Sequence, residues 1–398
     1  MSKTIIEDFP HLDFKRCWSI DTECAMNLGR CDVYVQMLGS IPIPPESQDK
    51  LRGVAFERGA QATTAIEGNT LTDDEFQQML NGMPLPKSRA YQGTEVQNAL
   101  DAMNNIWTRL VENADIKPIS PKMLCDWNKA IGKDLGPLYD GVPGKLRRDR
   151  RHVGKYLAPP PENVPALLES FCEWLKVEFR FGAKEASVAE AIQQAISAHV
   201  FFEWIHPFAD GNGRTGRLLE FYILLRAGFP DVSVHVLANH YNATRSEYTS
   251  HFDVARKKRN LSEFIKYAVQ GLTDGLAASL KEVQKQSCKI AWESHVYKTF
   301  ATYSDYNKRS VFKRRRILAL AMPTEASFSM IDLLRSSNEL MLEYLNHDER
   351  MIRNDAEVLL ELKLMVPVDD NSKPPLYAAN IRPMLSQHLP SRVGGGIR

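Results

Sequence analysis

Apolar residues recur at intervals of three and four along most of the chain, for example from Val96 to Leu110 and from Leu167 to Leu175. This spacing places them on one face of an α-helix. Alternating runs typical of strands are rare. The best one, residues 147–153 between Pro143-Gly144 and Gly154, predicts a small hairpin. The pattern as a whole predicts a mainly α-helical protein.

Two further helical patterns flank a short polar loop. Residues 188–204 form an amphipathic pattern that Pro207 ends, because proline inside a helix removes a hydrogen bond. Residues 212–227 form the next pattern, closed by Gly228-Phe229-Pro230. The stretch I-H-P-F-A-D-G-N-G-R-T-G-R, residues 205–217, is therefore a helix-loop-helix junction with its glycines at the start of the second helix.

The character of the chain changes beyond about residue 290. Residues 313–316 are a basic run that opens an apolar stretch. Residues 328–335 and 349–364 predict two helices. Residues 364–368 and 376–378 predict the two short strands of a wing. Together they resemble a winged-helix domain. Residues 391–398, with three consecutive glycines, predict a disordered tail.

Bulk composition narrows the class of protein. With 398 residues, 43% hydrophobic and 25% charged, the chain resembles an ordinary globular protein of two or three domains. The net charge of +1 indicates that the molecule as a whole has no electrostatic preference for nucleic acid or an anionic membrane. The sequence contains no apolar run of about 18 residues and no signal-peptide pattern. The six cysteines lack C-x-x-C spacing, so we expect free thiols in a reducing cytoplasm.

The loop at 205–217 has the chemistry of an anion site. A helix N-terminus exposes unpaired N–H groups and the positive end of the helix dipole. Gly211 and Gly213 carry no side chain, so a phosphate can approach the backbone closely. Arg214 and Arg217 lie one turn apart on the second helix, and their guanidinium groups match phosphate oxygens. The loop therefore predicts a polyphosphate site.

Two more side chains of the loop suggest a reaction. Asp210 would repel the bound anion unless a cation lay between them, and Mg²⁺ held by one carboxylate plus substrate phosphates fits that position. His206 has an ordinary pKa of about 6.5, which suits a general base near neutrality. The stretch is not a phosphate-binding Walker loop or a dinucleotide fingerprint, because both need a preceding strand and other spacings.

The stretch H-P-F-A-D-G-N-G-R-T-G-R resembles the Fic family motif, H-x-F-x-[DE]-G-N-G-R-x-x-R, at every specified position. The resemblance covers roughly residues 50–270. It implies a Fic-type helical core with a small β-hairpin flap. It also implies a reaction, the transfer of AMP from ATP to a protein hydroxyl with release of pyrophosphate, with Mg²⁺ as cofactor.

The resemblance also implies roles for residues of the loop. His206 would be the base that deprotonates a target Ser, Thr or Tyr. Phe208 would anchor the loop in the core, and Asp210 would ligate Mg²⁺. The positions matching the anion hole and the arginines that hold the distal phosphates are Gly211, Asn212, Gly213, Arg214 and Arg217.

A second stretch, T-T-A-I-E-G-N-T at residues 63–70, resembles the family's inhibitory motif, [ST]-x-x-x-E-[GN]. Thr63, Glu67 and Gly68 are the matching positions. The resemblance implies that Glu67 pairs with Arg217 and occupies the space of the γ-phosphate, so that the resting enzyme is nearly silent. The alternative is a helix that ends at Gly68 with a solvated Glu67.

Two other segments resemble family features. Gly144 to Arg147, followed by Val153-Gly154, looks like the flap that docks the target backbone, and we assign Arg147, Arg151, Val153 and Gly154 to it. Six basic residues fall within 145–155 against one acid, which indicates either acidic target loops or a solvated surface. Tyr248 lies in a segment that resembles the one reaching the adenosine end of the nucleotide; core packing is the alternative. His199 is expected in the core.

The same residues are compatible with other functions. The same site is compatible with removal of AMP from a modified protein, with Glu67 orienting a water. A DNA-binding regulator using the winged-helix-like region is a third possibility, which the acidic residues of its helix at 349–364 disfavour. We expect a protein target, possible self-modification, a homodimer and no membrane partner.

The predicted domain organisation has four parts. Residues 1–115 are the N-terminal helical region with the inhibitory motif, and 116–275 are the catalytic core. Residues 276–390 contain a long helix and the winged-helix-like domain, and 391–398 are the tail.

Overall fold

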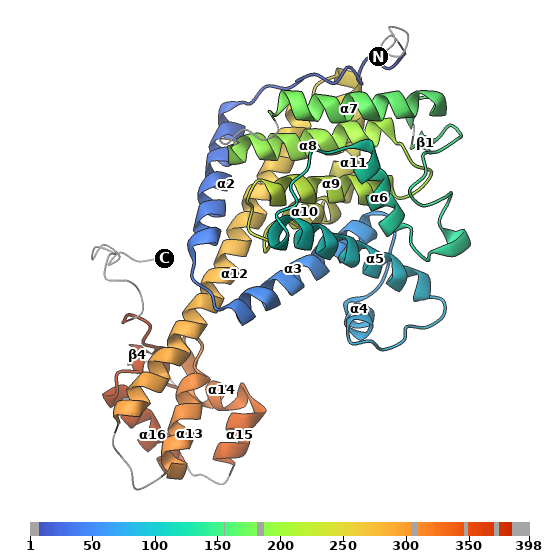
Figure 1. The fold of residues 1–398 in the computed structure, drawn as a ribbon. Coiled ribbons are helices and arrows are strands. Elements are labelled where there is room, and N and C mark those ends of the chain that lie inside the picture. Colours follow the sequence, from blue (N-terminus) through green and yellow to red (C-terminus); the bar gives the residue numbers. More distant parts are fainter. Residues whose placement is uncertain are drawn as a thin grey trace. The chain divides into compact units, whose positions relative to one another are not determined.

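The computed structural model describes residues 8–154, 156–180, 187–303, 309–345, 349–369 and 374–383. Helices predominate, so the predicted mainly α class is confirmed (Figure 1). The chain forms two compact units, residues 1–280 and 281–398. The boundary falls inside the long helix α12 (Ser262–Thr302). The finer division at residues 115 and 275 stays a prediction, and the predicted tail at 391–398 lies outside the described residues.

Two central helices carry the loop at 205–217. They are α8 (Val188–Ile205) and α9 (Asn212–Arg226), which lie side by side in the first unit (Figure 1). Every residue of α8 from Ala191 to Phe202 is buried. The prediction of an amphipathic helix at 188–204 is therefore wrong in one respect: a helix covered on all sides needs no polar face.

Other helices of the first unit enclose this pair. α2 and α7 pack on α8, whereas α3, α5 and α6 pack on α9. α3 ends at Ile66, and Gly68 follows it in the left-handed region with φ of +104°, which favours glycine. The bounds are α2 (Thr22–Ser40), α3 (Pro45–Ile66), α4 (Asp73–Leu80), α5 (Ala90–Trp107), α6 (Pro121–Ile131), α7 (Val164–Glu178), α10 (Val236–Ala243) and α11 (Arg245–Lys258). Short π and 3-10 turns are η1 (Thr108–Glu112), η2 (Gly136–Leu138) and η3 (Pro161–Asn163).

The predicted hairpin is present but shorter than its sequence pattern. β1 (His152–Val153) pairs antiparallel with β2 (Tyr156–Leu157), in the register His152 with Leu157. The preceding residues instead run along the loop: Leu146 forms an isolated antiparallel bridge with Phe208, and the Arg147 N–H donates to the Pro207 carbonyl at 3.0 Å. The flap is therefore attached to the loop at its base.

The second unit combines helices with a three-stranded antiparallel sheet in the order β3-β5-β4. Phe328 and Ser329, predicted as helix, pair with β5 instead, and α15 has no counterpart in the sequence prediction. The order of elements supports the winged-helix interpretation, which stays a prediction. The bounds are α13 (Arg309–Leu320), β3 (Phe328–Ser329), α14 (Met330–Arg335), α15 (Asn338–Tyr344), α16 (Glu349–Glu361), β4 (Met365–Asp369) and β5 (Leu376–Ala379).

A buried ion-pair cluster holds the second unit together beside its apolar core. Asp355 is fully buried and accepts from Arg314 Nε and Arg315 Nε, each at 2.7 Å, and from the Tyr344 hydroxyl at 2.9 Å. Two arginines of the basic run at 313–316 therefore form internal contacts. None of the helices in the described part of the chain is both long and apolar enough to cross a membrane.

Candidate active site

The loop begins with a strained residue. His206 caps α8 in the left-handed conformation, with φ of 49° and ψ of 61°, which a residue with a Cβ adopts only at a cost of about 1 kcal/mol. The neighbouring structure holds this turn, because the His206 N–H donates to Phe202 at 3.0 Å and the His206 carbonyl accepts from Arg147 Nε at 2.7 Å. The strain turns the chain sharply from α8 toward α9.

Asn212 and Phe208 close the loop on itself. The Asn212 side chain accepts from the Phe208 N–H and donates to the Phe208 carbonyl, both at 2.9 Å. The Phe208 ring is fully buried, as expected of an anchor. The Asn212 amide is thus occupied within the loop, so its contribution to an anion site would come from its backbone N–H at the start of α9.

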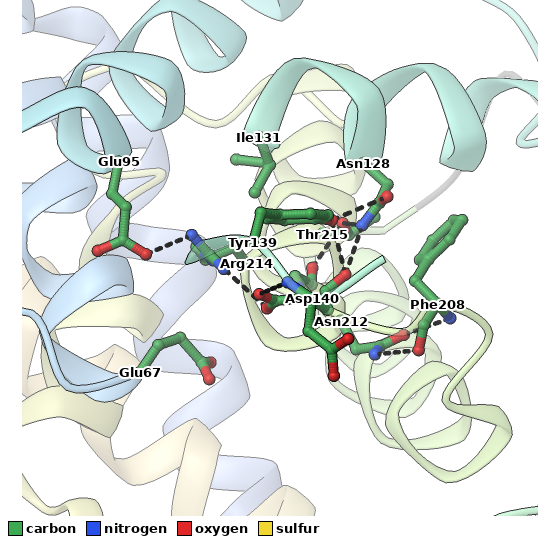
Figure 2. Close-up of polar contacts among 12 residues, drawn as sticks. Glu67, Glu95, Asn128, Ile131, Tyr139, Asp140, Phe208, Asn212, Arg214 and Thr215 are labelled. Atoms are coloured by element: carbon green, nitrogen blue, oxygen red, sulfur yellow. Dashed lines mark hydrogen bonds and ion pairs between the residues drawn. The ribbon is translucent and has the colours of Figure 1, made fainter. Parts of the chain in front are cut away.

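Two residues outside the motif support the loop: Asn128 from α6 and Tyr139 from the segment after it (Figure 2). The carbonyl of Asp210 accepts from the Tyr139 hydroxyl at 2.8 Å and from Asn128 Nδ2 at 3.0 Å, and Thr215 also contacts Asn128. These groups leave no room for a side chain at Gly211, where a Cβ would lie 2.9 Å from the Tyr139 oxygen. Gly211 also has φ of +75°, so the close packing and the backbone both require glycine there.

Arg214 lies between two carboxylates (Figure 2). Its Nη1 donates to Glu95 Oε1 at 2.7 Å and its Nη2 to Asp210 Oδ1 at 3.0 Å. Glu95 Oε2 also accepts from Asn69 Nδ2 at 3.1 Å. Burial raises the pKa of Glu95, although Arg214 opposes that effect. In this conformation Arg214 orients Asp210, and the prediction that it holds distal phosphates is still untested.

Arg217 makes most of its contacts with the second motif. Its Nε donates to Thr63 Oγ1 at 2.7 Å, and its Nη2 donates to the Thr63 carbonyl at 2.9 Å and to Glu67 Oε1 at 2.5 Å. Its Nη1 contacts the Tyr248 hydroxyl at 3.3 Å. Burial opposes the charge, but Glu67 raises the pKa of Arg217 above its usual value. The structure thus brings together Glu67 and Arg217, as the motif implies.

The Glu67 carboxylate lies directly over Gly213. A Cβ on Gly213 would meet Glu67 Oε1 at only 2.0 Å. Burial alone would raise the pKa of Glu67, but Arg217 and Arg214 outweigh it and hold the pKa below its usual range. An ionised carboxylate therefore occupies the space beside the glycine backbone where we expect a phosphate.

A cavity of about 450 Å³ opens beside the loop. His206 lines this cavity. Burial and then Arg147 lower the pKa of His206 to about 4, against the opposite effects of Glu67 and the Glu203 carbonyl. The imidazole is therefore neutral at pH 7. Further lining residues come from the flap and α11: Val153, Gly154, Tyr156, Arg245, Tyr248, Phe252 and Arg256.

The predicted flap residues occupy different settings. Arg147 is buried, and its guanidinium donates to the carbonyls of His206, Asp149 and Pro159, so here it holds the flap to the loop instead of facing a target. Arg151 is bound to Asp140 at 2.5 Å. Val153, 38% exposed, and Gly154 both line the cavity, and their role in docking a target stays a prediction.

Tyr248 and His199 form a buried pair behind Arg217. The Tyr248 hydroxyl contacts His199 Nε2 at 2.7 Å. His199 is fully buried, and burial lowers its pKa to about 3. His199 is thus a core histidine, as expected. Tyr248 both packs in the core and lines the cavity, so its role toward adenosine stays a prediction.

The residues present fit a Mg²⁺ ion. Asp210 lines the cavity with its side chain 28% exposed. Its Oδ1 accepts from the Gly211 N–H and Arg214, and its Oδ2 from the Asp140 N–H at 3.2 Å, which leaves part of the acceptor capacity of a carboxylate unused. Within the described chain, no group of three or more metal-ligating side chains is present. A cation held by Asp210 would need phosphate oxygens as further ligands, which suits Mg²⁺.

Residues 118–224 match the model of the Fic/DOC family. The chain therefore carries a Fic/DOC family domain. It is 31% identical over 209 residues to protein adenylyltransferase fic-1 of Caenorhabditis briggsae, covering 52% of this chain and 38% of that protein. It is 26% identical over 253 residues to protein adenylyltransferase Fic of Nematostella vectensis, covering 63% of this chain and 56% of that protein. The chain thus spans about half or less of these relatives.

Solved structures show the same fold. A Fic family protein from Desulfovibrio desulfuricans G20 matches with a TM-score of 0.55 and 19% identity, covering 96% of this chain and all of that one. Fic-1 (residues 134–508) of C. elegans matches with a TM-score of 0.53 and 23% identity, covering 65% of this chain and 73% of that one. The predicted Fic-type helical fold is confirmed.

Proposed function

We propose that the chain is a protein adenylyltransferase in an inhibited state, which transfers AMP from ATP to a Ser, Thr or Tyr hydroxyl of a protein. The observation that carries this proposal is the position of Glu67. Its carboxylate lies over Gly213 and is paired with Arg217, where the site is built to take an anion. The names of the relatives, which are protein adenylyltransferases, support the reaction class.

His206 is the base in this proposal. A neutral imidazole in the cavity accepts the proton of the target hydroxyl, and the hydroxyl oxygen attacks the α-phosphorus in line. The bond from that phosphorus to the bridging oxygen breaks, and pyrophosphate leaves. The N–H groups at the start of α9, beside Gly211 and Gly213, face the charge that develops on the phosphate oxygens.

Asp210 is the residue that would hold Mg²⁺. When bound, the ion would offset the negative charge of the phosphate oxygens and of the departing pyrophosphate. The chain's own contribution is to fix the carboxylate: Arg214, Gly211 and the Asp140 N–H determine where its two oxygens point.

Inhibition follows from electrostatic competition. The distal phosphates and Glu67 are both anions that pair with Arg217, and they cannot share the space over Gly213. Breaking this pair leaves the buried Arg217 guanidinium without its carboxylate, which is strongly unfavourable unless a second anion replaces the first. ATP therefore binds productively only when the end of α3 moves away.

Label transfer from α-labelled ATP with Mg²⁺ tests the proposal. We would compare wild type, Glu67→Gly and Glu67→Gly/His206→Ala for self-labelling and for labelling of cell proteins. We expect label in Glu67→Gly only, at least about 10²-fold above the double variant. Absence of label in Glu67→Gly, with ATP still bound, would contradict transfer of AMP.

Removal of AMP from a modified protein is the second candidate. Glu67 favours it, because its side chain is 37% exposed and lines the cavity in its ionised form, where it can orient a water. Incubation of wild type with an AMP-modified protein distinguishes the two reactions. AMP release that Glu67→Gln abolishes would establish this second reaction.

The proposed partner is a protein segment that lies along the flap and adds to the short strand β1. We propose the second unit as a protein-contact or dimerisation module and not a DNA reader. Arg314 and Arg315 both form ion pairs with Asp355, so these two guanidinium groups of the basic run are engaged within the second unit. Binding of the full chain to random duplex at low salt would overturn this preference.

A further inference from the structure

We infer that Glu203 is a positioning residue for His206: its carboxylate accepts the Nδ1 proton of the imidazole, so that Nε2 is free to take the proton of the target hydroxyl. This inference rests on the proposed function. Glu203 lies outside the motif, one helical turn before His206 on α8. Both side chains line the same cavity.

The two side chains approach each other, and each has one buried polar atom without a hydrogen-bond partner among the described residues. Glu203 Oε2 lies 3.8 Å from His206 Nδ1, with the side chains 13% and 16% exposed. Within the described residues, Nδ1 of His206 and Oε1 of Glu203 are buried and have no hydrogen-bond partner. The Glu203 carbonyl lies close enough to the ring to raise the pKa of His206, but it does not make a hydrogen bond of proper geometry to Nδ1. A shift of less than 1 Å would complete a hydrogen bond between the two side chains.

Gly216 makes room for this carboxylate. A Cβ at position 216 would lie 2.8 Å from Glu203 Oε1 and 2.8 Å from His199 Nδ1. Position 216 is one of the unspecified positions of the loop motif, so the motif alone gives no reason for glycine. The packing gives one: any larger residue would push Glu203 out of line with His206.

The protonation state of Glu203 decides which nitrogen of His206 carries a proton. An ionised Glu203 accepts from Nδ1–H and leaves Nε2 with a lone pair. When Nε2 then takes the hydroxyl proton, the imidazolium is stabilised by the carboxylate. A protonated Glu203 would instead donate its O–H to Nδ1, leaving the proton of the neutral ring on Nε2, where it blocks base catalysis.

Glu67 acts on this pair as well. Burial and then the Glu67 charge raise the pKa of Glu203 to about 8, while Arg217 lowers it. In the resting protein at pH 7, Glu203 is therefore protonated, and departure of Glu67 favours its ionisation. Glu67 would thus inhibit in two ways: it keeps His206 in the tautomer that cannot act as a base, and it occupies the space of the phosphate. The charged and titratable groups facing Glu203 and His206 are Glu67, Arg147, Arg151, His199, Arg217, Glu220 and Tyr248.

Nitrogen NMR of histidine-labelled full-length protein tests the pair without any need for activity. The His206 signals are assigned by comparison with His206→Ala. We expect His206 to change from the Nε2–H to the Nδ1–H tautomer as the pH rises, near pH 8 in wild type and at lower pH in Glu67→Gly. Glu203→Gln should abolish the change. Glu220→Gln, which alters another buried carboxyl bonded to Tyr241, is the matched control and should keep it.

Kinetics in the Glu67→Gly background provide the second readout. Adding Glu203→Gln should lower kcat about 10- to 100-fold with KM for ATP nearly unchanged, and should remove the rise of kcat with pH. A tautomer that is the same in wild type and Glu203→Gln at every pH would overturn the inference, even if Glu67→Gly transfers AMP. The opposite outcome is also distinguishable. If the tautomer changes with pH in wild type but not in Glu203→Gln, and Glu67→Gly transfers no AMP, the proposed function is wrong and the pairing of Glu203 with His206 stands.

Discussion

Single residues decide whether the site accepts a phosphate. Glu67→Gly removes the inhibitory carboxylate and also frees the space over Gly213, whereas a substitution at Gly213 removes the carboxylate from that space but fills the space itself. A methyl group at position 213 must displace the Glu67 carboxylate, which lies 2.0 Å from the Cβ position. The same methyl fills the space that a phosphate needs. We therefore expect Gly213→Ala to melt at a lower temperature than wild type yet transfer at least about 10²-fold less label than Glu67→Gly. Equal labelling of the two variants would show that the anion site lies elsewhere.

The Glu67–Arg217 pair also has a defined pH dependence. Burial opposes ionisation of Glu67, but the two arginines outweigh it and place its pKa below 4.5. A carboxyl with a lowered folded-state pKa stabilises the fold above its unfolded pKa and loses that contribution as pH falls through the folded value. The part of the melting-temperature difference between wild type and Glu67→Gln that comes from this ion pair should thus shrink below about pH 4.5. A difference that grows on acidification would contradict this assignment.

At the scale of elements, the attachment of the flap to the loop depends on Arg147. Its guanidinium serves three backbone carbonyls, and its side chain is buried. Arg147→Met should lower the free energy of unfolding by about 3 kcal/mol, or roughly 6–12 °C in melting temperature, because charged hydrogen bonds are lost and carbonyls stay buried. Thermal unfolding measures the loss.

Arg151→Ala is the matched control for Arg147→Met. Arg151 makes only partly exposed ion pairs with Asp140 and Asp149, so its loss should cost less than about 1 kcal/mol. Weaker labelling of an acidic target by Arg151→Ala, at unchanged self-labelling, would support the target-docking role. Equal melting temperatures for the two variants would show that the contacts of Arg147 are unimportant.

The sequence predicts features whose residues are close together in the chain, and it misses features whose residues come together only in the folded structure. The loop and the inhibitory motif are contiguous stretches, and their residues meet because α3 ends beside the start of α9. Glu95, Asn128 and Tyr139 belong to no motif, since they reach the loop only through tertiary packing of α5, α6 and the segment after α6. Glu203 looked like one more acid in an amphipathic helix. Arg147 lies in a basic run, and composition gives no sign that, among the described basic residues of that run, this one is buried.

At the scale of the whole molecule, the second unit should be separable from the reaction. Asp355→Ala removes a carboxylate that accepts from Arg314, Arg315 and Tyr344 and that balances the charge of two arginines, which costs about 3–5 kcal/mol. The site contacts described above all lie within the first unit. We therefore expect a lower melting transition assigned to residues 281–398 by hydrogen exchange, with self-labelling of Glu67→Gly unchanged. Loss of labelling would show that the second unit contributes to catalysis.

The position of Glu67 at the very end of α3 makes it a ligand tethered to its own receptor. Such a ligand has an effective concentration set by how often the last turn of α3 is formed. The apparent affinity for ATP is the intrinsic affinity multiplied by the fraction of molecules in which that turn has opened. Asn69, which joins the segment after Glu67 to Glu95 and to the carbonyl of Gln92, holds the turn closed. The level of activity would then depend on how often the C-terminal end of α3 unfolds. A partner that binds residues 67–69 and displaces them would activate the protein without contacting the nucleotide.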